Sequence, residues 1–146
     1  MNRPVYRTRR KARVVALQAL YEVDTVNHKG EDVLNRLLLE TQLPEVSANF
    51  AHELVKGVTD NLPEIDSYIK KFATAWPIAQ IPAIDRNILR LAIFELLIDN
   101  RIPVRIGINE AVELAKSFGS DNSPKFVNGV LGSIVLELKG NETEET

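Results

Sequence analysis

The sequence predicts an all-α protein made of two packed helical bundles, with about seven helices in all. Apolar residues recur three and four positions apart in the long segments, and no convincing run alternates apolar with polar residues. All seven prolines fall between these segments or in their first turns, where a missing N–H costs least. A length of 146 residues fits one domain or two small halves that share a core. We therefore expect a single domain over 1–146, with sub-bundles at about 1–76 and 82–140.

The first half of the chain predicts four helices. Their apolar stripes are Val14, Leu17, Leu20 and Tyr21; Val33, Leu34, Leu37 and Leu38; Ala51, Leu54, Val55 and Val58; and Ile65, Ile69, Phe72 and Trp76. Asn61 is expected to cap the fourth helix, with Pro63 in its first turn and Glu64 placed to bond back.

The second half predicts three helices. Residues 84–98 are apolar on nearly every face, so this helix should lie in the middle of its bundle. The next helix is expected to end at Gly119, and the last to begin at Ser123-Pro124. Residues 141–146 are polar and acidic and are expected to form a frayed, flexible tail.

Four charged residues lie on the apolar central helix: Asp85, Arg86, Arg90 and Glu95. Buried carboxylate–arginine pairs can be catalytic, but inside a bundle they more often satisfy one another or cap neighbouring helices. We expect the structural role here.

The net charge of −2 conceals an asymmetry along the chain. Six of the 18 basic residues lie in the first 13 positions, and the first acid is Glu22, so the rest of the chain carries −8. We call this basic N-terminal segment the arm, and it includes Arg7, Arg9, Arg10, Lys11 and Arg13. Arginine pairs phosphate oxygens bidentately and stacks on bases, so the arm is predicted to bind nucleic acid, the alternative being a solvated helix face. Tyr21 could add stacking, although it also fits a partly buried position.

Lys125 and Phe126 begin the last predicted helix. Val127 and Val130 should take the buried face, which turns Lys125 and Phe126 partly outward. An aromatic beside a lysine at a helix N-terminus suits a base and a phosphate. The alternative is a phenylalanine that closes the end of the core.

Signatures of catalysis and of cofactor binding are missing from the sequence. It contains no Gly-Lys-Ser/Thr phosphate loop, no dinucleotide fingerprint and no serine elbow. Cysteine is absent, and His28 and His52 lack partners at metal-site spacing. No apolar run is long enough to span a membrane, and the basic N-terminus does not resemble a signal peptide. We expect a cytoplasmic protein without enzyme activity, cofactor or metal.

Several segments, taken together and in this order, resemble the NusB transcription antitermination family. They are Arg9–Arg13, Ala16–Tyr21, Ile84–Ala92, Phe94–Leu97, Ile108–Gly119 and Lys125–Leu131. Each is an ordinary helical segment, but all of them together, in this order and at this spacing, are specific to the family. One departure is Gln80–Pro82, where the family tends to place a charged stretch.

The resemblance implies a compact bacterial NusB-like domain that binds boxA-type single-stranded RNA of ribosomal RNA leader transcripts. It implies two protein partners, the small-subunit ribosomal protein NusE and an RNA polymerase antitermination complex. The family's arginine-rich RNA-binding motif maps onto Arg9, Arg10, Lys11 and Arg13. Lys125 and Phe126 match a second part of the family's RNA surface, whereas Arg7 lies just outside the matched block.

Two other functions compete with this one. A NusB-like domain also precedes the catalytic domain of ribosomal RNA cytosine methyltransferases, but 146 residues leave no room for that second domain. A purely structural helical partner with a solubilising arm is the third hypothesis, and the salt dependence of RNA affinity separates it from the first. The sequence leaves a homodimer open.

Overall fold

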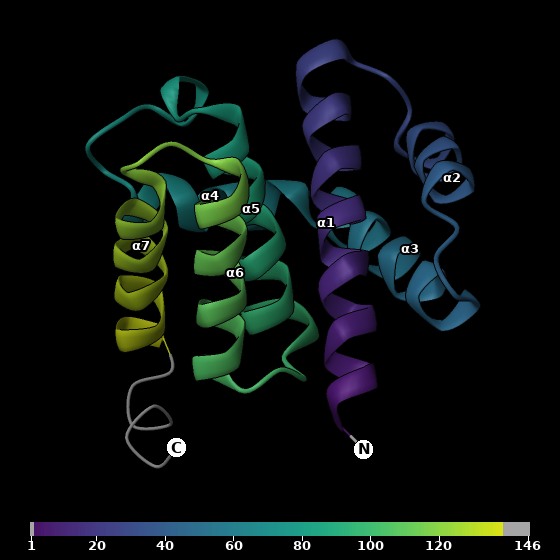
Figure 1. Cartoon of the computed structure of the whole chain (residues 1–146). Coiled ribbons are helices and arrows are strands. Elements are labelled where there is room, and N and C mark those ends of the chain that lie inside the picture. Colours follow the sequence, from purple (N-terminus) through teal and green to yellow (C-terminus); the bar gives the residue numbers. More distant parts are fainter. Residues whose placement is uncertain (1, 139–146) are drawn as a thin grey trace. The chain divides into compact units, whose positions relative to one another are not determined.

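The computed structural model describes the backbone of residues 2–138 and the side chains of residues 9–138 (Figure 1). All regular structure in this described part is helical, which confirms the all-α prediction. The chain separates into two compact units, residues 1–60 and residues 61–146. The tail expected at 141–146 lies outside the described residues. Within the described part, no helix is both long and apolar enough to cross a membrane.

Unit 1 is a three-helix bundle. It contains α1 (Asn2–Val26), α2 (Gly30–Thr41) and α3 (Glu45–Asp60), and each helix packs against the other two (Figure 1). The first two helices stop where a residue takes a left-handed conformation, Asn27 after α1 and Gln42 after α2, and each N–H closes the last turn. The three expected apolar stripes are buried or half-buried apart from Tyr21, and Leu17, Leu34 and Leu54 are almost fully buried.

Unit 2 is built around one central helix. Its elements in chain order are α4 (Leu62–Phe72), the 3₁₀ turn η1 (Ile78–Gln80), α5 (Ala83–Ile93), the π-helical turn η2 (Phe94–Asp99), α6 (Val104–Phe118) and α7 (Ser123–Leu138). Helix α5 packs against α4, α6 and α7, which confirms its predicted central place. The described helix differs from the expected one because its last part, η2, is a wider π turn that ends at left-handed Asn100.

The boundary between the units lies upstream of the break expected at 76–82. Helix α4 belongs to unit 2 because it packs on α5 and α7. Trp76 is a second difference: α4 ends at Phe72, and the Trp76 side chain lies beyond it and is 54% exposed. Asn61 occupies the expected N-cap position with Pro63 in the first turn, but its side chain makes no capping hydrogen bond.

Gly119 ends α6, as predicted, and its surroundings leave no room for a side chain. A Cβ atom at this position would overlap Ser123 Oγ and lie 2.9 Å from the Ala115 carbonyl oxygen. The absent side chain therefore lets the start of α7 approach the end of α6 closely. Ser123 Oγ uses that approach to accept a hydrogen bond from the Ser120 N–H at 2.9 Å.

Candidate nucleic-acid interface

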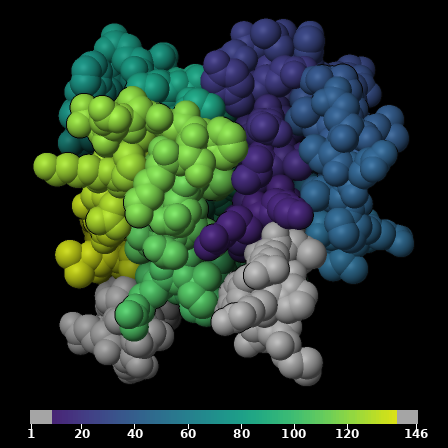
Figure 2. Space-filling model, in the orientation of Figure 1, coloured from purple at the N-terminus to yellow at the C-terminus, as the bar shows by residue number. Residues whose placement is uncertain are grey.

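The first described turns of α1 carry the cationic side chains predicted from the sequence. Arg9, Arg10 and Lys11 are all exposed, and the purple atoms from this part of α1 reach the surface in Figure 2. The backbone of Arg7 belongs to the same helix, but its side chain lies outside the described residues. The structure therefore presents three positive charges on consecutive residues at the surface of unit 1.

Arg13 differs from the expectation of an exposed arm, because it is only 4% exposed. It lies four residues after Arg9, so both point from the same face of α1. Both guanidinium groups lie over the ring of Phe50 on α3, with Cζ 4.7 Å from the ring centroid for Arg9 and 5.4 Å for Arg13. These distances are within the range of a cation–π contact. The arm is thus divided between an exposed part and a part that packs on the core.

Phe50 was missed from the sequence as a site residue. It is 7% exposed and precedes Leu54 by four positions, so the pattern marks it as a core residue and nothing more. Its relation to the arginines could not be predicted, because the packing of α1 on α3 brings together residues some 40 positions apart in sequence.

Tyr21 lies farther along α1, on the side that carries Arg10. The two residues are eleven positions apart, which is close to three turns, so their side chains leave the helix in nearly the same direction about 16 Å apart. Tyr21 is 40% exposed, more than its predicted partly buried position implied. Its ring is therefore accessible for stacking on a base.

Lys125 and Phe126 lie together on the first turn of α7 in unit 2. Lys125 is exposed and Phe126 half-buried, whereas Val127 and Val130 are buried, as the apolar pattern predicted. The helix start beneath them is held in place by Ser123, whose hydroxyl donates a 2.6 Å hydrogen bond to buried Asp85 on α5. A cation and an aromatic edge therefore sit on a fixed helix N-terminus.

The arginines of α5 are structural, as predicted. Arg90 pairs with both carboxylate oxygens of Asp66 at 2.9 Å and also donates to Asn87. Arg86 donates to the carbonyl oxygens of Ile78 and Ile81 at 3.1 and 2.7 Å, and so holds η1 against the start of α5. These donors are occupied by protein acceptors within unit 2.

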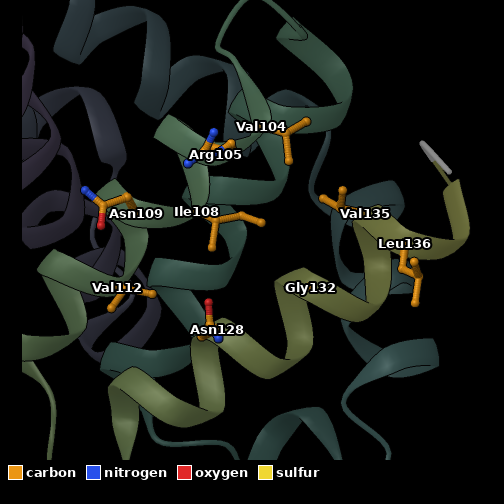
Figure 3. Close-up of a pocket in the computed structure, with 9 residues that line it drawn as sticks. All are labelled: Val104, Arg105, Ile108, Asn109, Val112, Asn128, Gly132, Val135 and Leu136. Atoms are coloured by element: carbon orange, nitrogen blue, oxygen red, sulfur yellow. The ribbon is translucent and has the colours of Figure 1, made fainter. Parts of the chain in front are cut away.

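An apolar groove runs along α6 and α7 in unit 2 (Figure 3). It encloses about 520 Å³ and is lined by Val104, Arg105, Ile108, Asn109, Val112, Asn128, Gly132, Val135 and Leu136. Arg105 is the one charged residue in this lining, so the groove offers no pair of acid and base groups. Nor do the described residues contain a group of three or more His, Asp or Glu side chains placed to hold a metal ion.

Fold and surface together define a class: a small all-helical protein whose first helix presents clustered arginine and lysine side chains. Comparison with known proteins gives the family. The model of the NusB family matches residues 10–135. The chain is 52% identical over 131 residues to the transcription antitermination protein NusB of Dehalococcoides mccartyi, covering 90% of this chain and 92% of the relative. The chain belongs to the NusB family.

Solved structures agree with this assignment. T. maritima NusB superposes with a TM-score of 0.84 at 35% identity, over 94% of this chain and 97% of that one. A chain from a complex of the antitermination factors NusB and NusE with double-stranded RNA superposes with a TM-score of 0.82 at 29% identity, over 88% and 96% of the two chains. The family expected from the sequence motifs is confirmed.

Proposed function

We propose that this protein is a non-enzymatic transcription antitermination factor. It binds boxA-type RNA of ribosomal RNA leader transcripts together with NusE, as part of an RNA polymerase complex in the bacterial cytoplasm. The observation that carries the proposal is the run of exposed Arg9, Arg10 and Lys11 on α1 of a NusB-family chain. The solved NusB–NusE complex with double-stranded RNA supports RNA and NusE as partners.

Two groups of residues are proposed to contact RNA, one within each unit. Unit 1 supplies cations and a stacking ring from α1, and unit 2 supplies the first turn of α7. The residues are Arg7, Arg9, Arg10, Lys11, Arg13, Tyr21, Lys125 and Phe126. Arg13 contributes from a buried position, by its packing on Phe50.

The test is RNA binding by a charge variant of the arm. Arg9→Ala with Arg10→Ala should weaken binding of a single-stranded boxA RNA by about tenfold or more, because both side chains are placed to meet phosphate. Lys29→Ala with Lys70→Ala removes the same charge from exposed positions elsewhere and serves as the control. Equal losses in the two double variants would contradict a localised RNA site on α1.

Salt dependence gives a second measurement of the same surface. Each neutralised phosphate of a single strand contributes about −0.7 to the log–log slope of affinity against salt, so four contacts, from Arg7, Arg9, Arg10 and Lys11, give a slope near −3. The arm variant should reduce that slope to about −1.4, since it removes two of the contacts. A parallel titration with a double-stranded RNA determines which form the surface prefers.

Joint binding with NusE is tested by linkage. If RNA contacts both proteins, each raises the affinity of the other for RNA by the same factor. We expect NusE to bind without RNA, and the pair to hold boxA RNA more tightly than this protein alone. Equal RNA affinity with and without NusE would contradict joint binding and leave RNA binding by α1 intact.

A further inference from the structure

The ring of Phe50 occupies a special place in unit 1, because it faces two guanidinium groups from successive turns of α1. We propose that Phe50 is a positioning residue of the RNA surface: its ring face fixes the guanidinium of exposed Arg9 so that Arg9 meets the phosphate backbone in a preset orientation. Buried Arg13 supports the same ring from the adjacent turn. This inference rests on the proposed function.

The chemistry of the contact explains why a ring suits this role. A guanidinium stacked on an aromatic uses its flat face for the contact, and its N–H donors point outward in the plane of the group. Those in-plane donors are the ones that pair phosphate oxygens bidentately. A carboxylate in the place of Phe50 would instead occupy the donors and cancel the charge. The ring therefore orients Arg9 while leaving its phosphate-binding geometry intact.

Orientation matters because an arginine side chain has many rotamers. An exposed arginine loses this freedom when it binds, and the loss weakens the affinity. Phe50 is 7% exposed and held in the core by the packing of α3 on α1, so it is a rigid support. Arg13, itself buried, packs on the same ring from the adjacent turn, with its Cζ 5.4 Å from the ring centroid, and so helps to hold the ring in place.

The test is a double-mutant cycle in the full chain with a single-stranded boxA RNA as the probe. Phe50→Leu keeps an apolar side chain in the core but removes the ring face. It should weaken RNA binding by about threefold to fivefold, the size of an exposed cation–π contact. The salt slope should stay unchanged because no charge is removed. In an Arg9→Ala background, Phe50→Leu should have no further effect on RNA affinity.

Two controls separate positioning from stability. Val58→Ala truncates a buried residue on the same helix, away from the arginines, and should lower stability without changing RNA affinity. If Phe50→Leu does not fold, Phe50→Met fills a similar volume without a ring and replaces it in the cycle. The ring-current shifts of the Arg9 side-chain protons in the unmodified protein report the stacking with no substitution at all.

The outcomes are distinct. Wild-type RNA affinity in Phe50→Leu, with a loss in Arg9→Ala, overturns the positioning role and leaves the proposed function in place. Additive losses in the double variant also overturn it, since Phe50 would then act independently of Arg9. Unchanged affinity in Arg9→Ala removes this part of the proposed RNA surface and the inference with it. A loss in Phe50→Leu that disappears in the Arg9→Ala background supports the proposal.

Discussion

Each unit contains two arginines four residues apart on one helix. The groups that face the two arginines differ between the units. In unit 1, Arg9 and Arg13 of α1 lie over an aromatic ring. In unit 2, Arg86 and Arg90 of α5 donate to protein oxygens, including both carboxylate oxygens of Asp66. The spacing is the same, but the facing group decides the role. Acceptors make Arg86 and Arg90 structural, whereas the ring holds exposed Arg9 in place without using its in-plane N–H donors.

The strongest test of this contrast is the loss of Arg90. The side chains of Arg90 and Asp66 are only 11% and 19% exposed, so Arg90→Ala leaves a partly buried carboxylate without its partner. We expect the free energy of unfolding to fall by about 3 kcal/mol, measured by urea denaturation. Arg101 is the matched control in the same unit, because it pairs with Asp99 at 2.9 Å while its own side chain is 64% exposed. Arg101→Ala should cost less than about 1 kcal/mol, and equal costs would contradict the role of burial.

The second test concerns Asp85, a buried carboxylate on α5. Ser123→Ala removes the hydroxyl that donates to Asp85 at 2.6 Å and leaves a carboxylate that is 5% exposed without that donor. We expect the free energy of unfolding to fall by about 2 kcal/mol. Ser133 on the same helix is exposed, and Ser133→Ala should change stability by less than about 0.5 kcal/mol. Thermal or urea denaturation of the two variants measures the difference.

The third test compares the buried and the exposed arginines within the arm of α1. Arg13→Ala should destabilise the protein by about 1 kcal/mol, because the buried side chain packs against Phe50. Arg10 is exposed, and Arg10→Ala should change stability by less than about 0.5 kcal/mol. Equal stability of the two variants would show that the packing of Arg13 contributes nothing.

The smallest expected effect is electrostatic and lies at the other end of α1. Hydrogen bonds from His28 and Arg36 hold the pKa of Glu22 below its ordinary value. The folded pKa is thus below the unfolded one, so this contribution to stability is present at neutral pH and is lost as pH falls through the folded pKa. Glu22→Gln should lower the urea midpoint slightly at pH 7 and not at all once Glu22 is protonated. A difference that persists in acid would assign the effect to packing instead.

The sequence was sufficient for the parts of the fold that depend on local pattern. The all-round apolar character of 84–98 predicted the central place of α5, and Gly119 and Ser123 marked real helix ends. It was insufficient where distant residues decide the outcome. Helix α4 was assigned to the first half because nothing local reveals that Asp66 meets Arg90.

The candidate site shows the same division. Clustering of cations predicted the exposed Arg9, Arg10 and Lys11, since charge runs are recognisable without a structure. It could not separate Arg13 from them, because burial of Arg13 depends on how α3 packs against α1. Phe50 was missed as a site residue for the same reason, because a phenylalanine in an apolar stripe looks like any other core residue until its neighbours are known.

The π turn η2 at the end of α5 affects how this chain tolerates changes in length. A π turn is an α-helix that carries one residue more than the regular ladder needs, and here the Asn100 N–H closes it by donating to Glu95 O, five positions back. Deleting a single residue within Phe94–Asp99 would therefore let the ladder close as ordinary α-helix. The helices on either side, α5 and α6, would keep their own buried faces. Insertions and deletions of one residue among relatives are thus expected to gather at this turn.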